Sequence, residues 1–210
     1  ETEGLRGSFD SSISLGTGVR AQSSACGLVV AGATGNGAPS GCLSPTSGIG
    51  DQGNLNYGRG DAFTTYLKGS HELLLKFPED VTVMARANWV RDFSATHTTG
   101  VLSATTPPGM GGLTGSASED LRFKARLLDL WVSKSFAIGE RQARVRVGNQ
   151  VINWGESLFF PGGINATNAL DYMRLAQPGV QLKEAVLPAP MASFATGLGH
   201  GLNLETYAQF

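Results

Sequence analysis

Long stretches of alternating apolar and polar side chains limit the possible folds of this sequence more than any other feature. Residues 8–22 place Phe9, Ile13 and Leu15 on one face and mostly serine, glycine and charged residues on the other. Successive side chains of a β-strand point to opposite faces, whereas an α-helix repeats every 3.6 residues. The pattern therefore predicts a long strand with one apolar face and one polar face.

The same alternation recurs six more times. It predicts further strands at 62–77, 81–93, 121–136, 142–152, 185–198 and 202–210. The pattern is imperfect, and Leu74 falls on a polar face. His71 falls on an apolar face, and the phase slips at Leu128 and Asp129, where a β-bulge would restore the two faces.

The predicted connections alternate between short and long. The short ones are 78–80, 138–141 and 199–201, and the long ones are 23–61, 94–120 and 153–184. Outer-membrane barrels have short turns at one end and long loops at the other, and their strands need about 9–11 residues to cross the bilayer obliquely. The sequence therefore predicts an all-β fold, the antiparallel meander of a transmembrane outer-membrane β-barrel with about seven strands and one short helix in a long loop.

The strand count predicts an incomplete barrel. Seven is odd, whereas single-chain bacterial barrels use even numbers, and the chain stops inside an alternating strand at Phe210. An open edge is not tolerated in lipid. We expect residues 1–210 to form a single β-barrel domain or the N-terminal part of one, with the wall completed by further residues or other chains.

Composition agrees with an exported protein. The net charge is −1 and charged residues make up 16%, so no basic excess points to nucleic acid. No stretch of about 18 apolar residues predicts a transmembrane helix. Cys26 and Cys42 bracket part of a predicted outer loop, residues 23–60. A disulfide between them would fit the periplasm or the cell surface, and two free thiols are the alternative.

The polar strand faces collect charges. The candidate lumen residues are Lys68, Glu72, Arg86, Arg122, Lys124, Arg126, Arg144 and Arg146. One interpretation is a path or binding site for a polar or anionic group. The alternative is a network of paired charges that fills a barrel interior.

The connection 153–184 is the most distinctive segment. Its apolar and polar motifs predict that it folds over or into a barrel mouth, and Asn168 is expected to cap a helix at 169–176. The segment is either a constriction, gate or ligand-contacting plug, or a structural cap. Its candidate residues are Trp154, Glu156, Phe159, Phe160, Asn165, Asp171, Arg174 and Lys183.

Catalytic patterns are absent from the sequence. The three histidines share no spacing, no Gly-x-Ser-x-Gly elbow occurs, and the glycine-rich run at 32–37 opens no predicted helix. We therefore expect no enzyme activity, no cofactor and no metal site.

Several motifs resemble the proteobacterial outer-membrane domain-of-unknown-function family 1302. The similarity is densest from Val145 to Met191, with VRVGNQVINWGES from Val145, GGIN from Gly162 and PGVQLKEAVLP from Pro178. It also includes GSFD from Gly7, GNLNY from Gly53 and LKGSHEL from Leu67. It departs in the cysteine loop and around residues 105–118.

The resemblance implies a porin-like outer-membrane barrel of a Gram-negative bacterium, usually longer than this chain. Such proteins tend to be encoded beside a periplasmic lipoprotein-like protein and an inner-membrane exporter. The first hypothesis is thus a channel or transport component for a hydrophobic or amphipathic solute or lipid. The alternatives are a non-conducting, partner-binding outer-membrane scaffold and a soluble β-sandwich. The resemblance assigns no site residues, although Trp154, Glu156, Asn165 and Lys183 match its dense motif.

Overall fold

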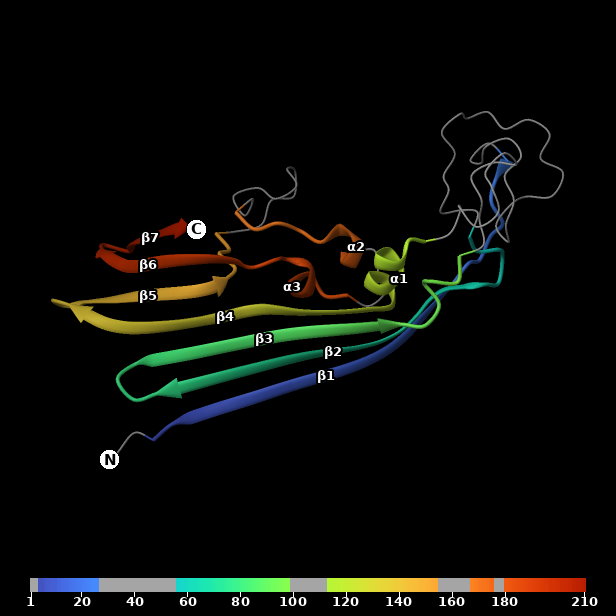
Figure 1. Ribbon diagram of the computed structural model, residues 1–210. Helices are drawn as coiled ribbons and strands as arrows, with labels where there is room; N and C mark the ends of the chain where they lie inside the picture. Colours follow the sequence, from blue (N-terminus) through green and yellow to red (C-terminus); the bar gives the residue numbers. More distant parts are fainter. Residues whose placement is uncertain (1–3, 27–55, 99–112, 155–166, 176–179) are drawn as a thin grey trace. The chain divides into compact units, whose positions relative to one another are not determined.

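A computed structural model describes residues 4–26, 56–98, 113–154, 167–175 and 180–210. These residues form seven strands and three short helices (Figure 1). The strands are β1 (Arg6–Val19), β2 (Ala62–Phe77), β3 (Val81–Asp92), β4 (Phe123–Ile138), β5 (Arg141–Gln150), β6 (Ala189–Gly199) and β7 (Leu202–Gln209). The helices are α1 (Gly115–Arg122), α2 (Tyr172–Leu175) and α3 (Leu182–Ala185).

All seven strands belong to one sheet, and their order in the sheet is their order in the sequence. The ladders β4–β5, β5–β6 and β6–β7 are antiparallel, with Leu130 opposite Asn149 and Ala143 opposite Thr196. The predicted antiparallel meander of seven strands is therefore confirmed. The sheet is open, because β1 and β7 are its two edges and do not pair with each other.

The strand limits follow the alternation closely. β2 has the predicted limits, and the others differ by a few residues at their ends. β6 differs most, because it begins at Ala189 instead of at residue 185. Residues 182–185 form α3, and Val186 forms an isolated bridge with Leu170, so this part of the chain is already engaged elsewhere.

The chain divides into two compact units. Unit 1 comprises Glu1–Ile13, Gly69–Asn88 and Ala125–Phe210, and unit 2 comprises Ser14–Lys68 and Trp89–Lys124. Strands β5, β6 and β7 lie wholly in unit 1, together with α2 and α3. We describe each unit by itself.

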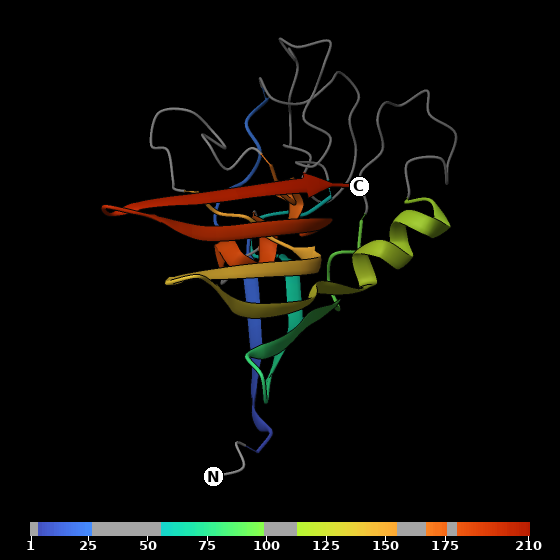
Figure 2. The same cartoon turned by 90° about the vertical axis from the view of Figure 1, so that its left-hand side faces the viewer.

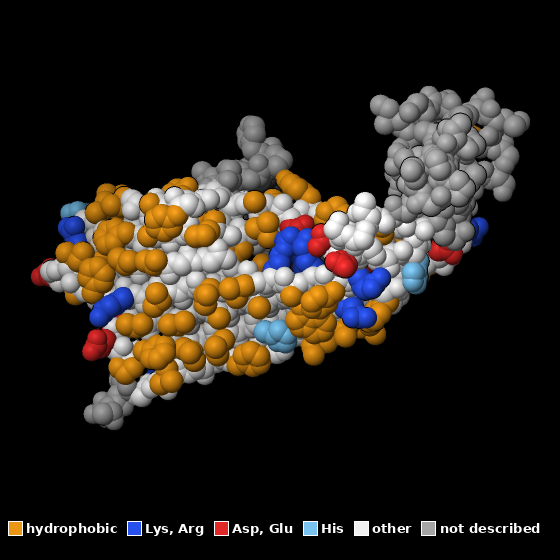
Figure 3. Space-filling view, in the orientation of Figure 1, with side chains coloured by type: hydrophobic (Ala, Val, Ile, Leu, Met, Phe, Trp, Pro, Cys, Tyr) orange, Lys and Arg blue, Asp and Glu red, His pale blue; other side chains and the backbone are white. Residues whose placement is uncertain are grey.

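One face of the unit 1 strands is apolar and exposed. Val132, opposite Val147, is 45% exposed, and Ile138 at the end of the same strand is 51% exposed. Figure 3 shows hydrophobic side chains spread widely over the visible strand surface. We call this surface the apolar face. Its exposed large side chains in β4 to β7 include Leu130, Val132, Phe136, Ile138, Val147, Leu202 and Leu204.

The other face of these strands is the polar face. Its residues alternate with the apolar ones, and it carries Ser133 and Ser135 on β4 and Arg144 and Arg146 on β5. The predicted change of phase occurs in β4, where the neighbours Leu128 and Asp129 are both buried. The side-chain amide of Asn149 donates to the carbonyl oxygen of Leu128 at 2.5 Å and so fastens β5 to this irregularity.

The helices differ from the single predicted one. Helix α1 was not expected, and it is capped by Thr114, whose hydroxyl accepts a hydrogen bond from the Ala117 amide. It extends to Arg122, so Arg122 was wrongly assigned to a strand; a basic side chain is favoured in a last turn. Helix α2 is a single turn, shorter than the predicted 169–176. In the described part of the chain, no helix has the length and apolar character needed to cross a membrane.

Candidate functional site: the folded-back segment and the polar face

The chain between β5 and β6 folds back on itself. We call residues 153–188 the folded-back segment, of which 153–154, 167–175 and 180–188 are described. The Asp171 amide donates to the Ala185 carbonyl, and the Leu187 amide donates to the Ala169 carbonyl, both at 2.8 Å. These bonds flank the Leu170–Val186 bridge. In Figure 2 α2 and α3 are partly hidden behind β5 and β6, and Figure 1 shows that the two helices lie past the ends of these strands.

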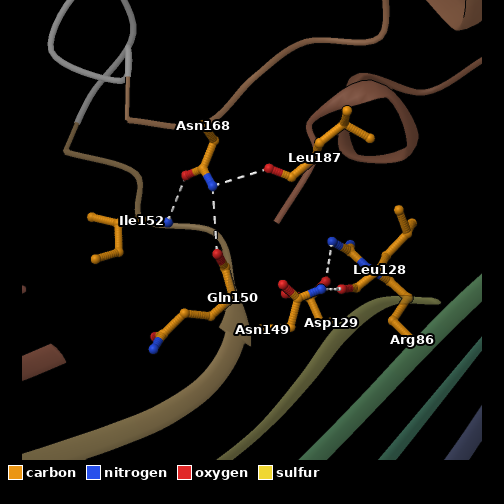
Figure 4. A network of polar contacts seen from close by, with 8 residues as sticks. All are labelled: Arg86, Leu128, Asp129, Asn149, Gln150, Ile152, Asn168 and Leu187. Carbon is orange, nitrogen blue, oxygen red and sulfur yellow. Dashed lines mark hydrogen bonds and ion pairs between the residues drawn. The ribbon is translucent and has the colours of Figure 1, made fainter. Parts of the chain in front are cut away.

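Asn168 joins the folded-back segment to the end of β5 (Figure 4). Its Oδ1 accepts from the Ile152 amide at 3.1 Å, and its Nδ2 donates to the carbonyl oxygens of Leu187 at 3.0 Å and Gln150 at 3.4 Å. The prediction that Asn168 caps a helix was wrong, because its amide is used in these long-range contacts. Asn168 is buried, and its side chain satisfies backbone groups that have little access to water.

Gln150 links β5 to β6 through hydrogen bonds of its side-chain amide. Its side chain is fully buried, and its Nε2 donates to the Met191 carbonyl at 2.9 Å. Its Oε1 accepts from the Ser193 hydroxyl at 3.2 Å. Gln150 and Asn168 thus fix the two ends of the folded-back segment where it leaves and rejoins the sheet.

Two candidate charges pair with carboxylates. Arg86 on β3 forms an ion pair with Asp129, and Arg126 on β4 pairs with Asp171 of the folded-back segment at 2.5 Å. All four side chains are mostly shielded from solvent. The Arg126–Asp171 pair ties the segment to β4, which agrees with the paired-charge interpretation for these residues.

Arg174 of α2 is a buried cation, only 4% exposed. Burial lowers the pKa of its guanidinium, and the charge of Arg126 lowers it further, whereas Glu184 and Asp171 raise it. Its Nη2 atom is buried without a hydrogen-bond partner. The two carboxylates balance the charges of Arg126 and Arg174, so this cluster is close to neutral.

Arg144 and Arg146 are arranged differently. The Arg146 guanidinium lies 4.3 Å from the centre of the Trp131 ring, a cation–π contact. Within the described residues neither arginine forms an ion pair. The structure therefore separates the predicted basic set into paired members and this pair on β5.

Trp154 lies against β7. Its indole nitrogen donates to Oε2 of Glu205 at 2.9 Å, and its ring lies 5.3 Å from the Tyr207 ring. Lys183 in α3 is exposed. The candidates Glu156, Phe159, Phe160 and Asn165 lie outside the described residues. Cys42 does too, so the predicted disulfide with Cys26 stays a prediction.

The remaining charge candidates do not gather at the folded-back segment. Glu72 is half-buried on β2 in unit 1, and in unit 2 Lys68 is buried and Lys124 half-buried. Unit 2 also contains an open hollow of about 830 Å³ between Arg20, Tyr57 and Phe63. Burial and the charge of Asp92 raise the pKa of Tyr57. The Arg20 guanidinium donates hydrogen bonds to neighbouring loop groups, including the Tyr57 carbonyl, so its donors serve the local structure. The main candidate site is therefore the one in unit 1.

Sequence reasoning missed several residues of this site. It did not single out Gln150, Trp131 or Glu205, and it gave Asn168 only a local role. Gln150 and Asn168 stand within the dense motif region, which was an available signal. Apart from the Arg146 carbonyl, four residues from Gln150, their partners lie 16 to 43 residues away, and no local pattern reveals such contacts.

A family model with the description "Protein of unknown function (DUF1302)" matches residues 1–210. The chain belongs to the DUF1302 family. This finding confirms the resemblance seen in the motifs. No curated protein and no solved structure matches this DUF1302 chain. The family description assigns no activity.

Proposed function

We propose that this DUF1302 chain forms part of the wall of an outer-membrane β-barrel, and that the barrel is a transport component for a hydrophobic or amphipathic solute or lipid. The proposal includes export through the periplasm, contact with outer-membrane lipid, and cooperation with a periplasmic lipoprotein-like protein and an inner-membrane exporter. The observation that carries it is the apolar face.

The apolar face is costly in water. Large side chains such as Leu130, Val132 and Val147 are about half exposed on neighbouring strands. Burying a fully exposed side chain of this kind is worth about 1.5–3 kcal/mol, so covering the exposed half is worth roughly half of that, and a contiguous set favours an apolar surrounding. Lipid is a surrounding that suits strands with alternating apolar and polar residues.

The polar face and the folded-back segment support a transport role. In a barrel wall the face opposite the lipid lines the interior. The folded-back segment would then narrow the interior, held by Arg126–Asp171 and by Asn168. Tyr172 and Met173 of α2 are more than half exposed and would give this constriction an apolar surface.

The first experiment locates the protein. The full chain, expressed in a Gram-negative host with a signal peptide, should sediment with outer membranes and require detergent for extraction. Recovery in the aqueous fraction without detergent would refute the membrane proposal and favour the soluble alternative.

The second experiment measures transport. Liposomes containing the purified full chain should exchange a fluorescent fatty acid faster than empty liposomes. Asp171→Asn, which weakens the hold on the folded-back segment, should change that rate, whereas Lys134→Gln at an exposed ion pair should not. Equal rates with and without protein would reject the transport role.

The alternative is a non-conducting scaffold. It is favoured by one observation: β7 is an edge strand, and all its residues are exposed. An exposed edge pairs readily with another strand. Planar-bilayer recording separates the two functions, since the scaffold predicts a stable complex from native membranes and no conductance.

A further inference from the structure

Arg144 and Arg146 lie side by side on the polar face of β5, two residues apart. In the adjacent strands, Ser133 of β4 and Ser193 of β6 stand opposite Arg146. Ser135 and Ala195 stand opposite Arg144. Directly opposed residues in an antiparallel ladder have Cβ atoms about 4.5–5.5 Å apart. The register therefore gathers two guanidinium groups and three hydroxyl groups on one patch, which we call the arginine patch.

Two carboxylates lie near the arginine patch, but neither forms an ion pair with it. Asp129 and Glu205 are close enough to attract Arg146 electrostatically. Asp129, however, forms the ion pair with Arg86, and Glu205 accepts from the Trp154 indole. The charge of Arg144 acts on Arg146 more strongly than either carboxylate does, so the two cations repel each other, and a bound anion would relieve that repulsion.

The Arg146 side chain is held in place without using most of its donors. Trp131 lies against the flat face of its guanidinium, and Nε of Arg146 is buried with no hydrogen-bond partner. An arginine presents five N–H donors in a planar fork that fits phosphate oxygens. Stacking on Trp131 orients the guanidinium and so reduces the entropy lost when its Nη groups bind an anion, whereas the buried Nε takes no part in this.

The polar face is hollowed beside Arg144. A depression of about 440 Å³ is bordered by Arg144, Ser135 and Gln142 and reaches Asn203 and Glu205 across β6. Ala195, the residue between Arg144 and Glu205 in the register, is small and leaves this space open. The patch therefore has room for a group larger than a water molecule.

We propose that the arginine patch binds the phosphate head group of an amphipathic solute. This inference rests on the proposed transport function and deepens it by naming the polar end of the solute. Two guanidinium forks and the hydroxyl groups of Ser133 and Ser135 offer more donors than the two oxygens of a carboxylate readily accept, which favours phosphate. The Ser193 hydroxyl already donates to Gln150. The Arg126–Arg174 cluster has no comparable excess of positive charge, because Asp171 and Glu184 balance it.

Binding is tested on the full chain in detergent, with no membrane to cross. Calorimetry with short-chain dihexanoyl phosphatidate should show saturable binding, and dihexanoyl glycerol, which lacks the phosphate, should bind at least about tenfold more weakly. The double variant Arg144→Gln with Arg146→Gln should lose at least about tenfold in phosphatidate affinity. Arg141→Gln, on the same strand but the opposite face, should bind as the unaltered protein does.

The outcomes discriminate clearly. Equal binding of phosphatidate and the glycerol lipid, or an unaltered affinity of the double variant, would overturn the inference. Inorganic phosphate binding as tightly as phosphatidate would also overturn it, because the patch would then hold a free anion rather than a head group. If the double variant does not fold, as judged by circular dichroism, Arg144→Gln alone makes the comparison at an exposed side chain.

The two experiments distinguish failure of the head-group site from failure of the transport function. Fatty-acid exchange without phosphatidate binding would leave the transport proposal standing and remove the head-group site. Phosphatidate binding without fatty-acid exchange would leave the head-group site standing and remove the transport proposal.

Discussion

Gly148 on β5 has no room for a side chain. A Cβ there would lie 2.2 Å from the Leu130 carbonyl oxygen and 2.8 Å from Trp131 Cα. Its φ of +131° is also unfavourable for residues other than glycine. The close backbone approach brings Trp131 beside β5, where it contacts Arg146.

We expect Gly148→Ala to destabilise the fold by about 3 kcal/mol or to prevent it, because backbone atoms must move. Gly197→Ala is the matched control, since its Cβ would meet only Asn203 Oδ1 at 3.8 Å. It should cost less than about 1 kcal/mol. Denaturant titration of both variants measures this, and equal stabilities would contradict the close approach.

Asn168 makes a second prediction at the residue scale. Asn168→Ala leaves the Ile152 amide and two carbonyl oxygens without their partner, so we expect a loss of about 3 kcal/mol. Asn168→Asp keeps the acceptor but sets a carboxylate against those carbonyls, so it should be no more stable than the alanine variant. Thermal unfolding compares them, and near-native stability of the aspartate variant would argue against donation by Nδ2.

At the scale of elements, the folded-back segment depends on contacts rather than on intrinsic helix formation. Helices of four residues have no stability of their own. The Leu170–Val186 bridge and the Arg126–Asp171 pair supply what α2 and α3 lack. The segment should therefore loosen as a unit when one of these contacts is removed.

Arg126→Gln tests this expectation. Both partners of the pair are mostly shielded, so its loss should cost about 1–3 kcal/mol locally and speed amide exchange at residues 170–175. Lys134→Gln removes an ion pair whose side chains are 54% and 81% exposed, and it should change exchange little. Hydrogen exchange with mass spectrometry provides the comparison. Identical exchange in the two variants would show that Asp171 does not hold the segment.

The strands were predicted from the sequence more accurately than the helices. Strand β2 was predicted to the residue, because alternation is a local signal that a sheet with unlike faces must contain. The slip at Leu128 and Asp129 was visible for the same reason. Helix α1 was missed because its signal was a single capping threonine. Helix α2 was overextended because Asn168, a good cap by type, is engaged with Gln150 and Leu187.

At the scale of the whole molecule, the sequence predicted the meander but not the partners of its charges. Arg126 and Arg144 look alike in the alternation pattern, yet one pairs with Asp171 and the other forms no ion pair within the described residues. Pairing depends on how a connection of nearly forty residues returns to the sheet. No periodicity encodes that path.

The surroundings of the apolar face are tested by paired substitutions on β4. Val132 and Ile138 share this face and are 45% and 51% exposed. In lipid, Val132→Arg near mid-strand should cost about 2–4 kcal/mol, and Ile138→Arg at the turn about 0–1 kcal/mol. In water, both should cost less than about 0.5 kcal/mol. Folding into phospholipid vesicles, followed by denaturant titration, gives the two values.

The agreement between sheet order and sequence order has a consequence for the ancestry of the fold. Each strand pairs with the strands that precede and follow it in the sequence, so no strand pairs with one that is distant along the chain. Duplication or deletion of a hairpin would change the strand pairing at one place and leave the remaining ladders intact. Relatives of this protein can therefore be expected to differ by whole hairpins, while the strand pairs on either side of each change keep their register.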